Sequence, residues 1–320
     1  MSSFYLDLTD AELRLDGASL VVFGNGNRLK TIPLGLLERV VVRGGIALAG
    51  NVLTELARRG ISLTFLAARG LDRIAIVTGK PHNHARLRIA QYRAYTTEAF
   101  RLQFARGLVA AKIIAQTKAM SALKSNRPDL AFAIEACLES LLALIDQLPH
   151  APSIQVIMGI EGAASHAYFE ALTQAFPPSI GFKGRNRRPP RDPANACLSL
   201  GYTLLAAETT RAAYGIGLDP FIGFFHELEY GRESLSLDLM EPLRPRVDLF
   251  VWELFRDRML RKEHFHNDKG ACLLGKTGRQ AFFRTFEVFM RPVRRYLRTR
   301  TWQVSKTLLN AETLPKEAEA

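Results

Sequence analysis

The sequence predicts an α+β protein in which a small, β-rich N-terminal domain (residues 1–79) precedes a larger, all-α domain (residues 80–308). Short apolar segments separated by turn dipeptides fill the first quarter of the chain, a pattern typical of strands and hairpins. Beyond Lys80 the chain changes to long runs rich in Ala, Leu, Arg and Gln. Their apolar residues recur with a period of about 3.6, which indicates helices.

Turn signals separate several of the strands expected in the N-terminal domain. Asp16-Gly17 and Asn25-Gly26 favour tight hairpins because these dipeptides tolerate positive φ. One helix is expected over residues 47–58, ended by Gly60, since glycine readily adopts the left-handed conformation that closes many helices. The expected strands are residues 4–8, 12–15, 20–23, 30–34, 39–42, 61–65 and 73–77.

The C-terminal domain is expected to be built from helices alone. Asn126-Arg127-Pro128, a loop at 177–193 and a polar stretch at 262–278 interrupt the helical pattern. Residues 309–320, which end in PKEAEA, are expected to form a flexible tail. The expected helices are residues 84–122, 129–148, 152–175, 194–216, 238–262 and 278–306.

Composition and charge limit the function classes. The chain has 320 residues, a formal charge of +12 and a pI of about 9.9, so it should attract polyanions, nucleic acid first. Its three cysteines lack C-x-x-C spacing, which disfavours a disulfide framework and a cysteine zinc site and indicates a reducing cytoplasm. No run approaches the roughly 18 apolar residues of a membrane span, and the N-terminus lacks signal-peptide features. We therefore expect a cytoplasmic protein with no membrane partner.

Glu161 lies in the helical segment PSIQVIMGIEGAASHAYFEAL, where Ile157, Ala164 and Tyr168 share its face at about 100° per residue. A carboxylate therefore sits on an apolar stripe. Because burying an unpaired charge costs roughly several kcal/mol, Glu161 must be protonated, paired with a base, or bound to a cation. A buried glutamate–arginine pair is the structural alternative to a metal ligand.

His226 ends the apolar run DPFIGFF and could be a metal ligand or a hydrogen-bonded structural residue. The segment SLSLDLMEPLRPRVD adds Asp238, Glu241 and Asp248, which would share one helical face with Arg244. Ordinary helix-entry chemistry, with Asp238 as N-cap and Glu241 completing a capping box, is the alternative. Carboxylates with one imidazole suit Mg²⁺ or Mn²⁺, ions that polarise a phosphodiester.

Two concentrations of basic residues predict contacts with nucleic-acid phosphates. One is the loop GFKGRNRRPPRD, and the other is a stripe on the last helix at spacing i, i+3, i+4, i+7 with little acid to balance it. Arg244 is predicted to join them. The loop residues are Lys183, Arg185, Arg187, Arg188 and Arg191, and the helix residues are Arg291, Arg294, Arg295 and Arg298.

One motif points to a different class of protein. Residues 270–277, GACLLGKT, fit the phosphate-binding pattern G-x-x-x-x-G-K-[ST]. A phosphate-binding loop follows a buried strand of a parallel sheet, whereas the polar segment KEHFHNDK precedes this one. The context therefore argues against a nucleoside triphosphatase.

Four segments together match a known family: GIEG at 159–162, DPANACLSLGYTLL at 192–205, GLDPFIGFFH at 217–226 and LDLMEPLRP at 237–245. In this order, after a β-rich first quarter, they resemble the CRISPR-associated protein one family, the spacer-acquisition integrases. The resemblance covers nearly the whole chain. Asn195 and Tyr202 match positions of the second segment.

The resemblance implies a metal-dependent DNA endonuclease and integrase that inserts spacer DNA into a CRISPR array by attack of a 3′ hydroxyl on a repeat phosphodiester. It implies that Glu161, His226 and Glu241 hold Mg²⁺ or Mn²⁺, with Asp238 as a supporting carboxylate. The implied partners are double-stranded and branched DNA, a second copy bound through the N-terminal domain, and CRISPR-associated protein two. A non-catalytic nucleic-acid scaffold, whose carboxylates only pair with arginines, is the alternative.

Overall fold

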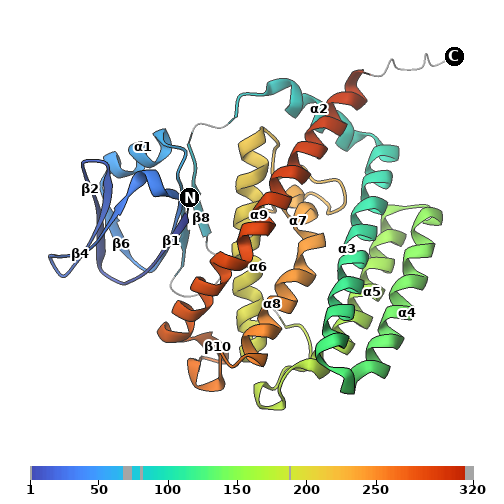
Figure 1. The fold of residues 1–320 in the computed structure, drawn as a ribbon. Helices are drawn as coiled ribbons and strands as arrows, with labels where there is room; N and C mark the ends of the chain where they lie inside the picture. The colour runs from blue at the N-terminus through green and yellow to red at the C-terminus, as the bar shows by residue number, and fades with distance from the viewer. Residues whose placement is uncertain (1, 68–73, 80–81, 187–188, 314–320) are drawn as a thin grey trace. The chain divides into compact units, whose positions relative to one another are not determined.

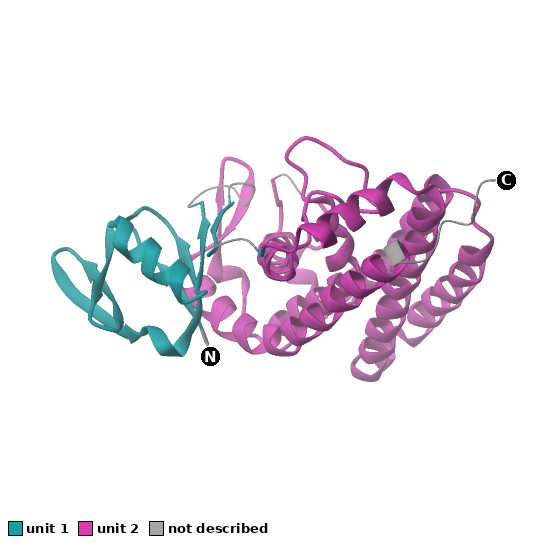
Figure 2. Ribbon diagram, turned by 90° about the horizontal axis from the view of Figure 1, so that it is seen from above, with its two compact units in different colours: residues 1–82 teal, residues 83–320 magenta. Residues whose placement is uncertain are grey.

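The computed structural model describes residues 2–67, 74–79, 82–186 and 189–313. The chain divides into two compact units, residues 1–82 and residues 83–320, coloured separately in Figure 2. The first unit contains mostly strands and the second mostly helices (Figure 1), so the predicted α+β class and its order along the chain are confirmed.

The first unit contains two four-stranded sheets. In the first, of order β1-β5-β7-β8, only β8 runs antiparallel to its neighbour. In the second, β2, β3 and β4 form an antiparallel meander and β6 pairs parallel with β2. The elements are β1 (Ser2–Asp7), β2 (Ala11–Asp16), β3 (Ser19–Gly24), β4 (Asn27–Pro33), η1 (Leu34–Leu36), β5 (Leu37–Arg43), β6 (Ile46–Leu48), α1 (Gly50–Arg58), β7 (Ser62–Leu66) and β8 (Ile74–Val77).

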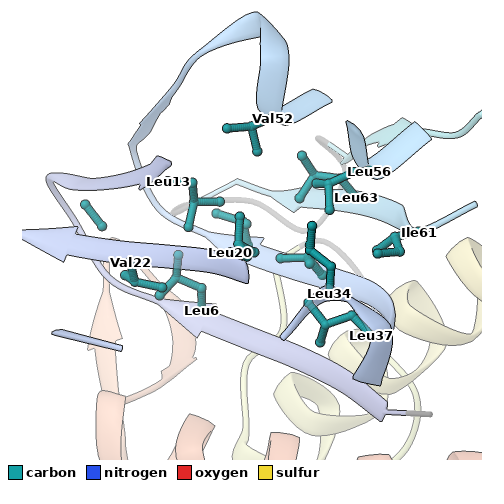
Figure 3. Packing of buried hydrophobic residues seen from close by; sticks show 13 residues of the cluster. Leu6, Leu13, Leu20, Val22, Leu34, Leu37, Val52, Leu56, Ile61 and Leu63 are labelled. Atoms are coloured by element: carbon teal, nitrogen blue, oxygen red, sulfur yellow. The ribbon is translucent and has the colours of Figure 1, made fainter. Parts of the chain in front are cut away.

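One apolar core joins these sheets and α1. Leu13, Leu20 and Leu63 are each 0% exposed and lie close together in Figure 3, with Val52 of α1 beside them. Asn25 and Gly26 both have positive φ at the turn between β3 and β4, as their sequence predicts.

The structure corrects two boundaries in this unit. The predicted helix at 47–58 begins only at Gly50, because residues 46–48 form β6 and pair with residues 11–13 of β2. The predicted strand at 30–34 ends at Pro33, and Leu34 begins a 3-10 turn. Arg73, at the start of the last predicted strand, lies outside the described residues.

In the second unit, α3, α4 and α5 pack against one another, and α6 packs against α7, α8 and α9 (Figure 1). Asp192 caps α6 by accepting a hydrogen bond from the Asn195 amide (2.8 Å), with Pro193 in the first helical position. The helices are α2 (Ala85–Thr96), α3 (Glu98–Asn126), α4 (Ala131–Gln147), α5 (Ile154–Ala175), α6 (Pro193–Ile216), α7 (Ser234–Met240), α8 (Arg244–Arg256) and α9 (Lys276–Thr313).

Two predicted helices are divided. The helix predicted at 84–122 breaks at Thr97, where the hydroxyls of Thr96 and Thr97 both donate to the Arg93 carbonyl and compete with the backbone. The helix predicted at 238–262 is replaced by α7, the 3-10 turn η5 (Glu241–Leu243) and α8. Pro242 has no amide hydrogen and cannot extend α7 as a regular helix.

A hairpin occupies the polar stretch that the sequence suggested as a loop. Strands β9 (Phe265–Asp268) and β10 (Ala271–Leu274) are antiparallel, and Lys269 and Gly270 turn between them with positive φ. The phosphate-loop pattern at 270–277 is therefore a hairpin turn, a strand and the start of α9, not a loop around phosphate. The last helix extends to Thr313, and the remainder of the predicted tail lies outside the described residues. None of the helices in the described ranges has the length and apolarity to cross a membrane.

Candidate metal centre

Two predicted ligands, Glu161 and Glu241, meet at one ammonium group. Glu161 lies on α5, Glu241 begins η5, and Lys112 lies in the middle of α3. The Nζ atom of Lys112 contacts Oε1 of Glu161 and lies 2.5 Å from Oε2 of Glu241. Ser165, one turn after Glu161, donates its hydroxyl to the same Oε1 atom at 2.8 Å. The Glu161 carboxylate on this apolar helix face is therefore paired with a base, which is one of the three possibilities that the sequence allowed.

Glu241 is buried and ionised. Burial acts to raise its pKa, but Arg244 and then Lys112 outweigh that effect and lower the pKa to about 2. Arg244 donates from Nε to Oε1 at 2.7 Å. The other oxygen, Oε2, is buried and faces Lys112 with no well-aligned hydrogen-bond donor among the described residues. Glu241 therefore has an anionic oxygen whose coordination a cation could complete.

His226 is held in place by Asp238. Asp238 is 0% exposed, and its Oδ1 atom lies 2.7 Å from Nδ1 of His226 and accepts the His226 amide at 3.0 Å. Its Oδ2 atom accepts the amides of Phe224 (2.6 Å) and Phe225 (3.1 Å). A carboxylate only accepts, so Nδ1 donates, and a metal ligated by this ring would bind at Nε2.

This geometry overturns the helix-entry alternative for Asp238. Asp238 lies within α7 and binds the 224–226 loop, whereas Glu233 precedes the helix and makes no side-chain cap bond. Gly223 makes this contact possible: a Cβ there would lie 2.6 Å from the Ser234 carbonyl carbon and 2.8 Å from Oδ2 of Asp238.

Asp248 belongs to a different group of side chains. It accepts a hydrogen bond from the Tyr202 hydroxyl, and burial raises its pKa to about 6 despite opposing effects from Tyr202 and Arg185. The guanidinium carbons of Arg185 and Arg244 lie 5.0 and 4.8 Å from the centre of the Tyr202 ring. The single helix on which Asp238, Glu241 and Asp248 were predicted to share a face is therefore wrong, because η5 interrupts it, and each of the three carboxylates binds a different partner.

The donor set fits a hard divalent cation. It combines two carboxylates with an imidazole whose Nε2 is not engaged by Asp238. Across the described ranges, no three His, Cys, Asp or Glu side chains are already arranged to hold a metal ion. The Lys112 ammonium lies between the two carboxylates in the place where such an ion would have to bind.

The predicted phosphate contacts separate into exposed and interior residues. Arg294 is only 6% exposed and pairs with Glu287 (2.8 Å) and Glu208 (3.4 Å), so its assignment to a DNA-facing stripe is wrong. Arg185 also points inward and donates to Oδ1 of Asn195 at 2.6 Å. Arg187 and Arg188 lie outside the described residues, and Arg244 pairs with Glu241. The exposed members are Lys183, Arg191, Arg291, Arg295 and Arg298.

Comparison with known proteins matches most of the chain to one family. A sequence profile described as CRISPR associated protein Cas1 matches residues 4–288. A CRISPR-associated endonuclease Cas1 of Thermodesulfovibrio yellowstonii is 40% identical over 92% of this chain and 93% of its own length.

Two solved structures share the fold. A casposase bound to integration product superimposes with a TM-score of 0.85 at 23% identity, covering 99% of this chain and 92% of the casposase. A chain of a Cas6-RT-Cas1–Cas2 complex superimposes with a TM-score of 0.81 at 22% identity over 97% of this chain and 35% of that one.

Proposed function

This chain belongs to the CRISPR-associated Cas1 family of endonucleases, and from that premise we propose that Glu161, His226 and Glu241 hold one divalent cation that acts on DNA phosphodiesters. The observation that carries the proposal is the meeting of the Glu161 and Glu241 carboxylates at one ammonium, with His226, which a buried aspartate holds by one ring nitrogen, close enough to Glu241 to help lower its pKa. We further propose that the reaction inserts spacer DNA into a CRISPR array. The fold shared with a casposase bound to integration product supports this step.

Each side chain of the proposed metal centre has a separate role. Mg²⁺ or Mn²⁺, when bound, would polarise the scissile phosphodiester and neutralise its developing charge. Glu161 and Glu241 supply anionic oxygens, and Arg244 fixes one oxygen of Glu241 so that the other points into the centre. His226 presents Nε2, and Asp238 prevents the ring from turning away.

We propose that DNA reaches this centre across the exposed basic residues of the 183–191 loop and α9. Exposed arginines contribute affinity that falls steeply with salt, because they release counterions from DNA. A 3′ hydroxyl of the incoming strand would attack the repeat phosphodiester and form a new P–O bond, while the bond to the repeat strand's own 3′ oxygen breaks and that oxygen leaves as a 3′ hydroxyl. This exchange requires no covalent enzyme intermediate. The partners we propose are double-stranded and branched DNA, a second copy bound through the first unit, and a Cas2 protein. The structural likeness to a chain of a Cas6-RT-Cas1–Cas2 complex supports the last of these.

The test uses branched and linear duplex DNA with and without Mn²⁺. Glu161→Gln, His226→Ala and Glu241→Gln should each lower cleavage and strand transfer by at least about a hundredfold, because each removes a ligand from the cation. The exposed Glu139→Gln of α4 is the matched control and should retain activity. Full activity in all three ligand variants would refute the site. A wild-type protein that binds DNA but has no metal-dependent activity would favour the scaffold alternative.

A further inference from the structure

Lys112 is a charged residue in an apolar part of α3. It is 8% exposed, and its neighbours one turn away, Leu108 and Gln116, are each 1% exposed. A buried ammonium is strongly disfavoured unless anions surround it. Here the two anions are the proposed metal ligands Glu161 and Glu241, which come from two other elements of the fold.

The ammonium contacts one oxygen atom of each of the two proposed carboxylate ligands. Arg244 occupies Oε1 of Glu241, so Oε2 is the atom left for a metal, and that atom lies 2.5 Å from Lys112 Nζ. On Glu161, Lys112 and Ser165 share Oε1. A metal that bridged the two carboxylates would therefore compete with Lys112 directly.

Charge balance favours the release of one base when a divalent cation enters. Glu161 and Glu241 carry two negative charges, and Lys112 and Arg244 already neutralise them. Arg244 is fixed by its bond to Glu241 and by its packing 4.8 Å from the Tyr202 ring centre. Lys112 is a compact ammonium on a flexible four-carbon chain, so it is the group that can move.

We propose that the Lys112 ammonium is an internal counter-ion that holds the metal ligands together before the divalent cation binds and that the cation must displace it. This inference rests on the proposed metal centre. The displaced ammonium needs a new anion, and a DNA phosphate at the reaction site provides one. Lys112 therefore couples the binding of the metal to the binding of DNA. DNA raises the affinity for the metal, and the metal raises the affinity for DNA by the same factor.

The test measures binding rather than activity. Mn²⁺ affinity is determined by calorimetry on the full chain without DNA, and the affinity for a labelled duplex is determined by fluorescence anisotropy with and without Mn²⁺. Lys112→Met should tighten Mn²⁺ binding by about tenfold or more, since it removes the competing charge. In wild type, Mn²⁺ should tighten DNA binding by about fivefold or more, and this gain should be smaller in Lys112→Met, where only the cation's own attraction to phosphate remains.

Lys118→Met is the matched control, because it makes the same change at an exposed position of the same helix and should behave as wild type. Lys112→Gln is measured in parallel, and thermal unfolding in EDTA establishes that each variant is folded. Lys112→Gln provides the test if Lys112→Met does not fold.

Mn²⁺ affinity that is equal or weaker in the folded Lys112 variants, but lost in Glu161→Gln, would overturn the role of Lys112 and leave the metal centre intact. Absence of Mn²⁺ binding in wild type and in both Lys112 variants would instead overturn the proposed function.

Discussion

Asp238→Asn tests how the 224–226 loop is held. In the structure, the two carboxylate oxygens of Asp238 accept bonds from three consecutive amides, those of residues 224–226, and from the His226 ring. Asparagine has the same shape, but only one oxygen. Its amide group must face two N–H donors, which then have no acceptor in a site that is fully buried.

The expected cost follows from those two donors. A hydrogen bond to a charged group contributes about 1.5–3 kcal/mol, and an unsatisfied buried donor costs a similar amount. The loss of two such bonds should lower the free energy of unfolding of the second unit by about 3–6 kcal/mol. Because whole domains are stable by only about 5–15 kcal/mol, the effect should be large in any equilibrium experiment.

Urea unfolding followed by tryptophan fluorescence measures the second unit selectively. The chain has two tryptophans, Trp252 and Trp302, and both lie in residues 83–320. The exposed Asp146→Asn of α4 is the matched control and should change stability by less than about 0.5 kcal/mol. A loss below about 1 kcal/mol for Asp238→Asn, with an unchanged unfolding slope, would refute the role assigned to Asp238.

Three further predictions concern buried groups. Burial raises the pKa of Asp248 to about 6 from an ordinary 3.8, so the folded state binds the proton more tightly and loses stability as pH rises from 4 to 6, by about 3 kcal/mol. In urea unfolding, the free energy of unfolding of Asp248→Asn should change less over this pH range than that of the wild type. An equal change with pH in both proteins would contradict this. Arg294→Met should cost about 3–5 kcal/mol in the same assay, because it removes the buried guanidinium that pairs with Glu208 and Glu287. Arg295→Met should instead chiefly weaken DNA binding and reduce its salt dependence in anisotropy titrations. Gly223→Ala should cost about 1–3 kcal/mol through steric overlap with Ser234, while Gly215→Ala, where a Cβ meets no atom within 4 Å, should be neutral or stabilising in thermal unfolding.

Local patterns predicted most of the fold because most of its elements are determined locally. The change from short strands to long helices, the Asn25-Gly26 turn and the helix beginning beside Asp192 each follow from a few neighbouring residues. Strand β6 was missed because it exists only through pairing with residues 11–13. The hairpin of β9 and β10 was missed because its residues are polar and short, so alternation could not reveal it.

Helical spacing alone gave a wrong prediction where a residue of another helix pairs with a member of the arginine stripe. Arg294 shares the helical spacing of Arg291, Arg295 and Arg298, but Glu208 of α6 and Glu287 of the same helix draw it into the interior. Glu287 was visible two turns earlier in the sequence, whereas Glu208 could be placed beside Arg294 only by the tertiary fold. A charge stripe therefore identifies a helix face without telling which of its members reach solvent.

The same reasoning applies to Glu161, for which the sequence predicted the need for a partner, and to Lys112, for which no prediction was made. A lone charge on an apolar helix stripe must find a counter-charge. That rule identified Glu161, and it applies equally to Lys112, which interrupts the apolar run LVAAKIIA. Applied to both, it would have predicted their pairing, because each is the ion that the other needs. It could not have added Glu241, which enters through a 3-10 turn far along the chain. That third group makes the charges unequal, because two carboxylates then surround one ammonium. If the proposed function holds, the contact that stabilises the metal-free fold also keeps the two proposed ligands together for a divalent cation.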